Sequence, residues 1–226
     1  MIWMKGLLLI LLAAVATASA TTCYKQLVNN NKNRKECFSA HRSFNDVNLY
    51  HLQNLINEHL EHSLKFTMLA SHFNKDIKNR NGFYKYFQGL SDEHWNDALE
   101  LIDYVTLRGG HLNQITVQFK NGTRRTSDSL SLQNLRLQDE RGEKHSLGHA
   151  LDVTRDLITN IRQLIHKTAA HGTENEDAVL AHFLEEKYTE KYVKKMRELS
   201  GFMTVLQSFT TEEEGLALDL FDQYIA

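Results

Sequence analysis

One helical stripe in the middle of the chain constrains the fold more than any other feature of the sequence. From residue 83 to residue 110, apolar or aromatic side chains recur every three or four positions, as on one face of an α-helix. The stripe consists of Phe83, Phe87, Leu90, His94, Asp97, Leu101 and Tyr104. Buried ionisable groups cost free energy unless they are paired. The stripe therefore predicts a packed helix with a polar cluster centred on His94 and Asp97.

The segment before this stripe has the same helical pattern. The chain contains no proline, and this absence favours long helices over strand-rich folds, whose turns usually use proline and glycine. A first helix of roughly 30 residues is expected after an N-cap at Asn45 or Ser43. Its apolar stripe carries His59 near the middle. A turn in which Gly82 takes a positive φ should then lead into the second helix, which should stop at Gly109-Gly110.

The segment after the stripe predicts a crossover followed by further helices. Residues 111–145 lack helical periodicity, and a loop of this length suits a connection that travels along a whole helix. A helix of about 27 residues is about 40 Å long, and a dozen extended residues span it. Helices are predicted over about 146–171 and 176–208, and a short one begins at residue 210 or 211. The expected fold is an all-α four-helix bundle with a long crossover between helices two and three and a short fifth C-terminal helix.

The N-terminus has the pattern of a targeting segment. Lys5 precedes an apolar run, and Ala18-Ser19-Ala20 provides a small-residue cleavage site. No later segment approaches the roughly 20 apolar residues that span a bilayer, so we expect no membrane association. The predicted location is the secretory pathway, ending in the extracellular fluid or the secretory lumen. The expected organisation is a signal peptide over residues 1–20, an N-terminal arm over 21–43 and a folded domain over 44–226.

The arm and the crossover carry two candidate covalent modifications. Cys23 and Cys37 are the two cysteines of the chain, and an oxidising compartment favours disulfides. They could pair within the chain or each reach another subunit, and a terminal arm permits either. Asn121 begins the sequon Asn121-Gly122-Thr123 and is a candidate glycosylation site. The net charge of −2 predicts no general affinity for nucleic acid.

Three segments resemble the ferritin family. They are Phe83-x-Lys85-Tyr86-Phe87, Leu107-Arg108-Gly109-Gly110 and Gly215-Leu216-Ala217-x-x-Leu220-Phe221-Asp222. The resemblance extends from about Asn48 to Ala226, and the signal peptide, paired cysteines and long crossover are similar to the secreted ferritins of insects. It implies a ferritin-like fold and iron storage and transport. It also implies a 24-subunit hetero-oligomeric cage that encloses a ferric mineral and is shared with a heavy-chain-like subunit.

The resemblance also implies where a catalytic subunit would oxidise iron. Such a ferroxidase centre uses a glutamate of helix one, a Glu-x-x-His pair of helix two, a glutamate of helix three and a glutamine of helix four. The corresponding positions here are His59, His94 with Asp97, Arg155 and Tyr192. Two irons need several carboxylates, whereas Arg155 would place a positive charge among them. We therefore expect a light-chain-like subunit that is not an enzyme and depends on its heavy-chain-like partner for oxidation.

Two other positions are candidates for contact with iron. In the family, light-type subunits nucleate mineral on acidic residues of helix two, and Asp92 and Glu93 occupy the matching region. Clustered carboxylates bind ferric ions readily, although a solvated helix face has the same pattern. The family's channel carboxylates near the start of helix four correspond to His182 and Glu185, so Glu185 alone keeps that chemistry.

Several alternatives remain open on the sequence. The buried polar residues could form a self-satisfied network in which Asp97 pairs with Arg155 or with a histidine. His59, His94 and Asp97 could instead bind one metal ion, since two histidines and an aspartate are a plausible zinc ligand set. A remodelled enzyme of the ferritin-like superfamily, or a secreted helical carrier or binding protein, would share the same secretion and size.

Overall fold

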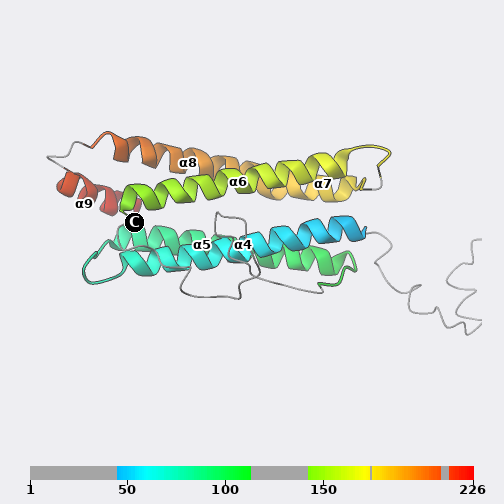
Figure 1. The fold of residues 1–226 in the computed structure, drawn as a ribbon, viewed down its shortest axis with the longest axis horizontal. Coiled ribbons are helices and arrows are strands. Elements are labelled where there is room, and N and C mark those ends of the chain that lie inside the picture. Colours follow the sequence, from blue (N-terminus) through cyan, green and yellow to red (C-terminus); the bar gives the residue numbers. More distant parts are fainter. Residues whose placement is uncertain (1–44, 113–141, 174, 210–213) are drawn as a thin grey trace, which may run out of the picture. The chain divides into compact units, whose positions relative to one another are not determined.

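The computed structural model describes residues 45–112, 142–173, 175–209 and 214–226. Helices α4 (Asp46–Phe73) and α5 (Asn81–Leu107) lie side by side as one antiparallel pair. Helix α6 (Glu143–Ala169) pairs with a composite fourth helix (Figure 1). The short helix α9 (Glu214–Ile225) contacts α5. Within the described ranges there is no strand, and the predicted all-α four-helix bundle is confirmed.

The orientation of the helices requires the long connection that the sequence predicts. Arg80, which immediately precedes α5, pairs with Glu143 at the start of α6, with 3.4 Å between Nε and Oε1. Both helices therefore begin at the same end of the bundle and run parallel. The end of α5 and the start of α6 therefore lie at opposite ends of the bundle. The connecting residues 113–141, which include Asn121, lie outside the described residues, as do Cys23 and Cys37.

The fourth helix is interrupted, which the sequence did not predict. Helix α7 (Ala178–Leu184) is followed by a π-helical turn, η2 (Glu185–Thr189), and then by α8 (Glu190–Gln207). A π turn holds an extra residue and often lies at functional positions. Tyr188 in the turn and Tyr192 after it are both buried, and their ring planes lie only 12° apart. The interruption therefore lies beside the helix that carries His59, which contacts both tyrosine rings.

The helix ends agree with the predicted caps at two of three places. The side chain of Asn45 accepts a hydrogen bond from the Val47 amide at 3.0 Å, as expected of an N-cap. Gly109, with φ of 75°, follows the end of α5 as expected. The prediction for Gly82 is wrong: the positive φ belongs to Asn79, at 48°, and Gly82 lies inside the first turn of α5. Asparagine tolerates the left-handed region because its short polar side chain bonds locally.

The core consists of two apolar clusters with polar residues between them. One cluster includes Leu52, Ile56 and Leu101, and the other includes Phe73, Phe87 and Leu147. Between them lies a set of buried polar side chains that we call the polar seam: His59, Ser63, Ser91, His94 and Asp97. The seam follows directly from the two stripes predicted on the first two helices. No helix of the described residues is long and apolar enough to cross a membrane.

Candidate functional site

Three helices bring the predicted seam residues together. His59 comes from α4, His94 and Asp97 lie one turn apart on α5, and Tyr192 comes from α8. The Nδ1 atoms of His59 and His94 are 3.2 Å apart, and the Tyr192 hydroxyl donates to the Asp97 carboxylate. Each residue occupies an apolar stripe of its helix, so helix packing turns all four inward. Sequence reasoning therefore identified four members of this cluster correctly as neighbours.

The cation of the cluster is Lys191, which the sequence analysis did not identify. Its ammonium donates to both oxygens of Asp97, at 2.6 and 2.7 Å, and lies 3.3 Å from Oε1 of Glu93. The Asp97 side chain is 6% exposed and that of Lys191 is 31% exposed. A lysine between the buried and the exposed face of a helix can bury its aliphatic stem while its ammonium group stays partly exposed to solvent. Lys187, Lys191 and Lys195 recur every four residues beside the inward tyrosines, a pattern that could have predicted this contact.

Arg155 does not belong to the seam, so the expectation that it supplies a buried positive charge is wrong. Its side chain is 53% exposed and pairs with Asp152, three residues earlier on the same helix, at 3.4 Å. Helix α6 turns Leu151, Thr154 and Ile158 toward the core instead. Arg155 lies at the border of this stripe. Successive residues of a helix are rotated by about 100° about its axis, so the residue after the buried Thr154 faces solvent. The alternative in which Asp97 pairs with Arg155 is likewise replaced by the pair with Lys191.

Burial sets the protonation of the seam. It lowers the pKa of both His59 and His94 well below the usual histidine value, and the positive charge of Lys191 acts in the same direction. Both imidazoles are therefore neutral near pH 7, and one Nδ1–H can donate to the other Nδ1. Burial raises the pKa of Asp97, whereas the hydrogen bonds from Lys191 and Tyr192 oppose that shift. Burial next to Asp97 raises the pKa of the Tyr192 hydroxyl, which stays protonated and donates.

This arrangement gives little support to a metal site in the seam. The ammonium of Lys191 lies against both oxygens of Asp97, so a metal ion bound there would be repelled by a second positive charge at close range. In the part of the chain that the structure describes, no three His, Cys, Asp or Glu side chains are placed to hold one metal ion. Lys191 and Tyr192 satisfy Asp97. His59 and His94 share one hydrogen bond, whereas Nε2 of His59 has no hydrogen-bond partner among the described residues. This geometry favours a mostly satisfied polar network over the mononuclear alternative.

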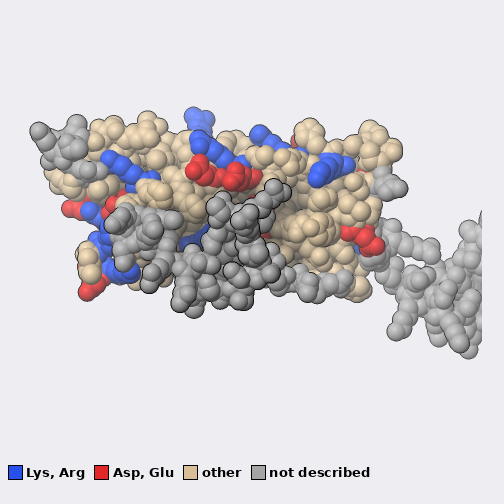
Figure 2. Space-filling view, in the orientation of Figure 1, with Lys and Arg blue, Asp and Glu red and all other residues tan. Residues whose placement is uncertain are grey.

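A ladder of ion pairs continues from the seam along α5 and the fourth helix, from η2 into α8. Lys187 pairs with Glu100 at 3.0 Å, and Lys195 pairs with Glu93 at 3.5 Å. Glu93, a predicted nucleation residue, thus lies between two lysines, since Lys191 contacts its other oxygen. Figure 2 shows acidic and basic side chains interspersed on the face in view, without a large area of one sign. Such mixed charge does not concentrate ions of either sign.

The remaining candidate residues lie at the surface. Asp92 is exposed and accepts a hydrogen bond from the Gln88 amide at 3.0 Å, so its carboxylate faces solvent. Glu185 is exposed at the start of η2. His182 lies 3.7 Å from Glu186 rather than beside Glu185. The predicted channel residue therefore retains an exposed carboxylate, and its neighbouring histidine is directed to a different glutamate.

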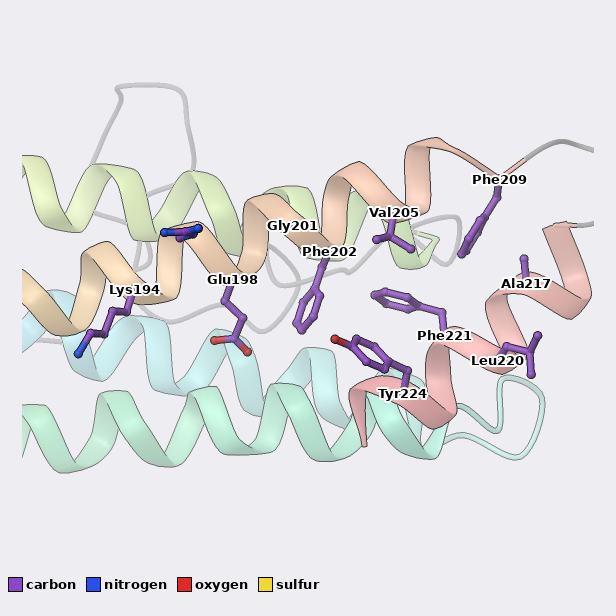
Figure 3. A pocket seen from close by; sticks show the side chains of 11 residues that line it. Lys194, Glu198, Gly201, Phe202, Val205, Phe209, Ala217, Leu220, Phe221 and Tyr224 are labelled. Carbon is purple, nitrogen blue, oxygen red and sulfur yellow. The ribbon is translucent and has the colours of Figure 1, made fainter.

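Two pockets lie on the described part of the bundle, one of them beside the seam. One, of about 820 Å³, lies between α8 and α9 and is mainly apolar. Figure 3 shows Phe202, Phe221 and Tyr224 turned toward one another in it. The other, of about 880 Å³, is a polar groove between α4 and α6 that is lined by acidic, basic and amide side chains. The groove includes His62, whose ring packs edge-on against that of His94 with 5.3 Å between ring centroids, so it lies next to the seam although neither His94 nor Asp97 lines it.

Comparison with known proteins agrees with this fold. The model of the ferritin family, described as a ferritin-like domain, matches residues 49–209. The ferritin light chain of Drosophila melanogaster is 38% identical over 77% of this chain and 74% of that protein. In Trichoplusia ni, the ferritin light chain is 30% identical over 95% of this chain and 94% of that protein, and the ferritin heavy chain is 28% identical over 97% of each.

A solved structure extends the similarity to three dimensions. The crystal structure of Trichoplusia ni secreted ferritin superposes with a TM-score of 0.74 and 29% identity. The match covers 91% of this chain and 98% of that one. Because the family model matches most of the described bundle and an insect light chain shares more than a third of its residues over most of this chain, the chain belongs to the ferritin family.

Proposed function

We propose that this chain is a light-chain-type subunit of a secreted ferritin, which stores iron but does not oxidise it. Its iron is cargo, held as a ferric mineral in the cavity of a cage of 24 subunits. A heavy-chain-type partner performs the oxidation. The two insect light chains named above share 38% and 30% of their residues with this chain, against 28% for the Trichoplusia ni heavy chain. The Drosophila melanogaster value supports the light-chain assignment, whereas the two Trichoplusia ni values are nearly equal, so the assignment depends mainly on the seam.

The observation that carries the proposal is the position of Lys191. A di-iron centre holds two cations among several carboxylates. Here the ammonium of Lys191 already pairs with Asp97, the carboxylate of the seam, and with the adjacent Glu93. An iron ion would have to displace a tethered cation and then find neutral imidazoles in place of further carboxylates. The first requirement opposes ferrous binding, and the second leaves the charge of two iron ions uncompensated, although a neutral imidazole can itself bind ferrous iron.

The surface residues have smaller roles in this proposal. Asp92 is the more suitable nucleation residue, because its carboxylate is exposed whereas Glu93 contacts Lys191 and Lys195. Glu185 would contribute charge to an iron channel formed with neighbouring subunits. Exposed apolar side chains on α9, namely Leu216, Leu220 and Tyr224, support burial of this helix in an assembly.

The N-terminal segment completes the proposal. Removal of residues 1–20 in the secretory pathway would expose Cys23 and Cys37 to an oxidising compartment, and Asn121 would accept a glycan there. Secretion of the structural relative from Trichoplusia ni is consistent with this route. Mass spectrometry of the purified chain, with and without reduction, would establish the mature N-terminus, the disulfide partners and the glycan. An N-terminus still at Met1 would contradict the secretory assignment.

Ferrous oxidation by the pure chain is the direct test. We expect the homopolymer to oxidise ferrous iron at the rate of the buffer control, and a co-assembled heavy-chain-type partner to restore rapid oxidation. Fast oxidation by the pure chain would refute the argument from Lys191 and favour an enzyme with a remodelled centre. Native mass provides the second measurement, since a species with the mass of one chain, at most 26.1 kDa before removal of residues 1–20, would exclude a cage and favour a helical carrier.

A further inference from the structure

The first turn of α5 lacks a cap from its own part of the chain. The first N–H groups of a helix have no partner within it, and the residue before the helix usually supplies an acceptor side chain. Here that residue is Arg80, whose side chain makes no capping hydrogen bond, and the first turn contains no acidic residue. Both the missing acceptor and the missing negative charge are unfavourable at a helix N-terminus.

The acceptor comes instead from the C-terminal helix. Oδ1 of Asp222, on α9, accepts a hydrogen bond from the Phe83 amide at 2.9 Å. Phe83 is the third residue of α5, the position that an N-cap side chain normally satisfies. Asp222 also places a carboxylate at the positive end of the helix dipole. A residue 139 positions away in sequence thus does the work of a local N-cap.

The neighbouring glycine provides the space for this contact. A methyl group placed on Gly82 would overlap the main-chain carbonyl oxygen of Asp222 and lie 3.0 Å from its Oδ1. The backbone of α9 therefore approaches α5 at a distance that only glycine permits. This packing explains why a residue that is unfavourable inside a helix occupies the first turn of α5, where no positive φ requires it.

Two further contacts support the same seating. Asp219 forms an ion pair with Arg80. Phe221 is 4% exposed and lies against Phe83, with 5.7 Å between ring centroids. Leu216 and Leu220 of α9 are exposed. The contact with α5 thus decides which face of the last helix is buried and which is exposed.

We infer that α9 is an intramolecular latch, in which Asp222 is the N-cap of α5 and Gly82 is the socket that admits it. Asp222 is a positioning residue: through the Phe83 amide it holds α9 in one orientation against the start of α5. The latch closes within a single chain, and it uses neither iron nor the polar seam.

Hydrogen exchange of the full chain tests the latch, with Gly82→Ala compared against Gly89→Ala. Both changes add one methyl group to α5, and a methyl group on Gly89 meets nothing within 4 Å. Overpacking at Gly82 is expected to accelerate exchange in α9 by about ten-fold or more, with α4 and α6 unchanged. Gly89→Ala is expected to leave α9 unaffected. Equal effects of the two variants, or α9 amides that exchange freely in the wild type, would overturn the inference.

Substitution of Asp222 separates capping from simple packing. Asp222→Ala removes the acceptor and is expected to accelerate exchange of the Phe83 amide and of α9 by roughly five-fold, a typical effect of losing an N-cap. Asp222→Asn keeps an acceptor oxygen and is expected to restore protection to near the wild-type level. If Asp222→Asn loses as much protection as Asp222→Ala, Asp222 is not a cap and the latch in this form is wrong.

Discussion

The pair between Lys191 and Asp97 makes a quantitative prediction about stability. Lys191→Met keeps most of the side-chain volume and removes the ammonium, so Asp97 loses its two hydrogen bonds of 2.6 and 2.7 Å. Removing one partner of a fully buried ion pair costs about 3–5 kcal/mol. Lys191 is 31% exposed, and Tyr192 still donates to Asp97. We therefore expect a smaller loss, of about 2–3 kcal/mol at pH 7.

Chemical denaturation followed by Trp95 fluorescence measures this loss, since Trp95 adjoins His94 on α5. Lys194→Met is the matched control on the same helix. Lys194 pairs with Glu190 in solvent, with both side chains 74% exposed, and we expect no measurable change in the free energy of unfolding. In the double variant with Asp97→Asn, the two losses should not add, and the coupling is expected to be about 1–3 kcal/mol.

The pH dependence supplies the refutation. Without Lys191, its effect of lowering the pKa of Asp97 is lost, and burial then holds that pKa higher than in the wild type. The folded state therefore binds a proton at Asp97 more tightly than the unfolded state does. Stability of the variant then falls as the pH rises through that folded pKa. The deficit of Lys191→Met relative to wild type should therefore be larger at pH 7 than at pH 5. A deficit equal to that of Lys194→Met, or one independent of pH, would refute the buried ion pair.

Three further predictions follow from other contacts. His59 and His94 have lowered pKa values in the folded state, so the unfolded state binds more protons. As the pH decreases below 6.5, the free energy of unfolding should therefore decrease by up to about 1.4 kcal/mol per pH unit for each histidine. Denaturation curves at three pH values test this, and His59→Gln should flatten the slope. Asp177→Ala removes the cap on α7 and the partner of Arg108; we expect a loss of about 2–3 kcal/mol in thermal unfolding. Arg155→Ala should leave the melting temperature unchanged, and a large decrease would return Arg155 to the interior.

Local patterns in the sequence were sufficient for the helices and for most of the seam. Helical periodicity depends on side chains three and four residues apart, so it can be read without tertiary information. It predicted the two stripes that bury His59, His94 and Asp97. Capping and turn residues also predicted a cap at Asn45 or Ser43 and the end of α5 at Gly109. The structure has the cap at Asn45 and a positive φ at Gly109.

The partners of these residues depended on how the helices pack. Arg155 and Lys191 both lie at the border of an apolar stripe. A small rotation of the helix about its axis there decides whether a side chain faces the core or the solvent. The π turn η2 precedes Lys191 in the fourth helix, and no local pattern predicted it. The Asp222 cap joins residues 139 positions apart. The sequence by itself therefore determines which face of each helix is apolar. The ion pair between Lys191 and Asp97 and the contact of α9 with α5 are decided only by the tertiary structure. Each of them requires two segments that are distant in the sequence to lie at hydrogen-bonding distance.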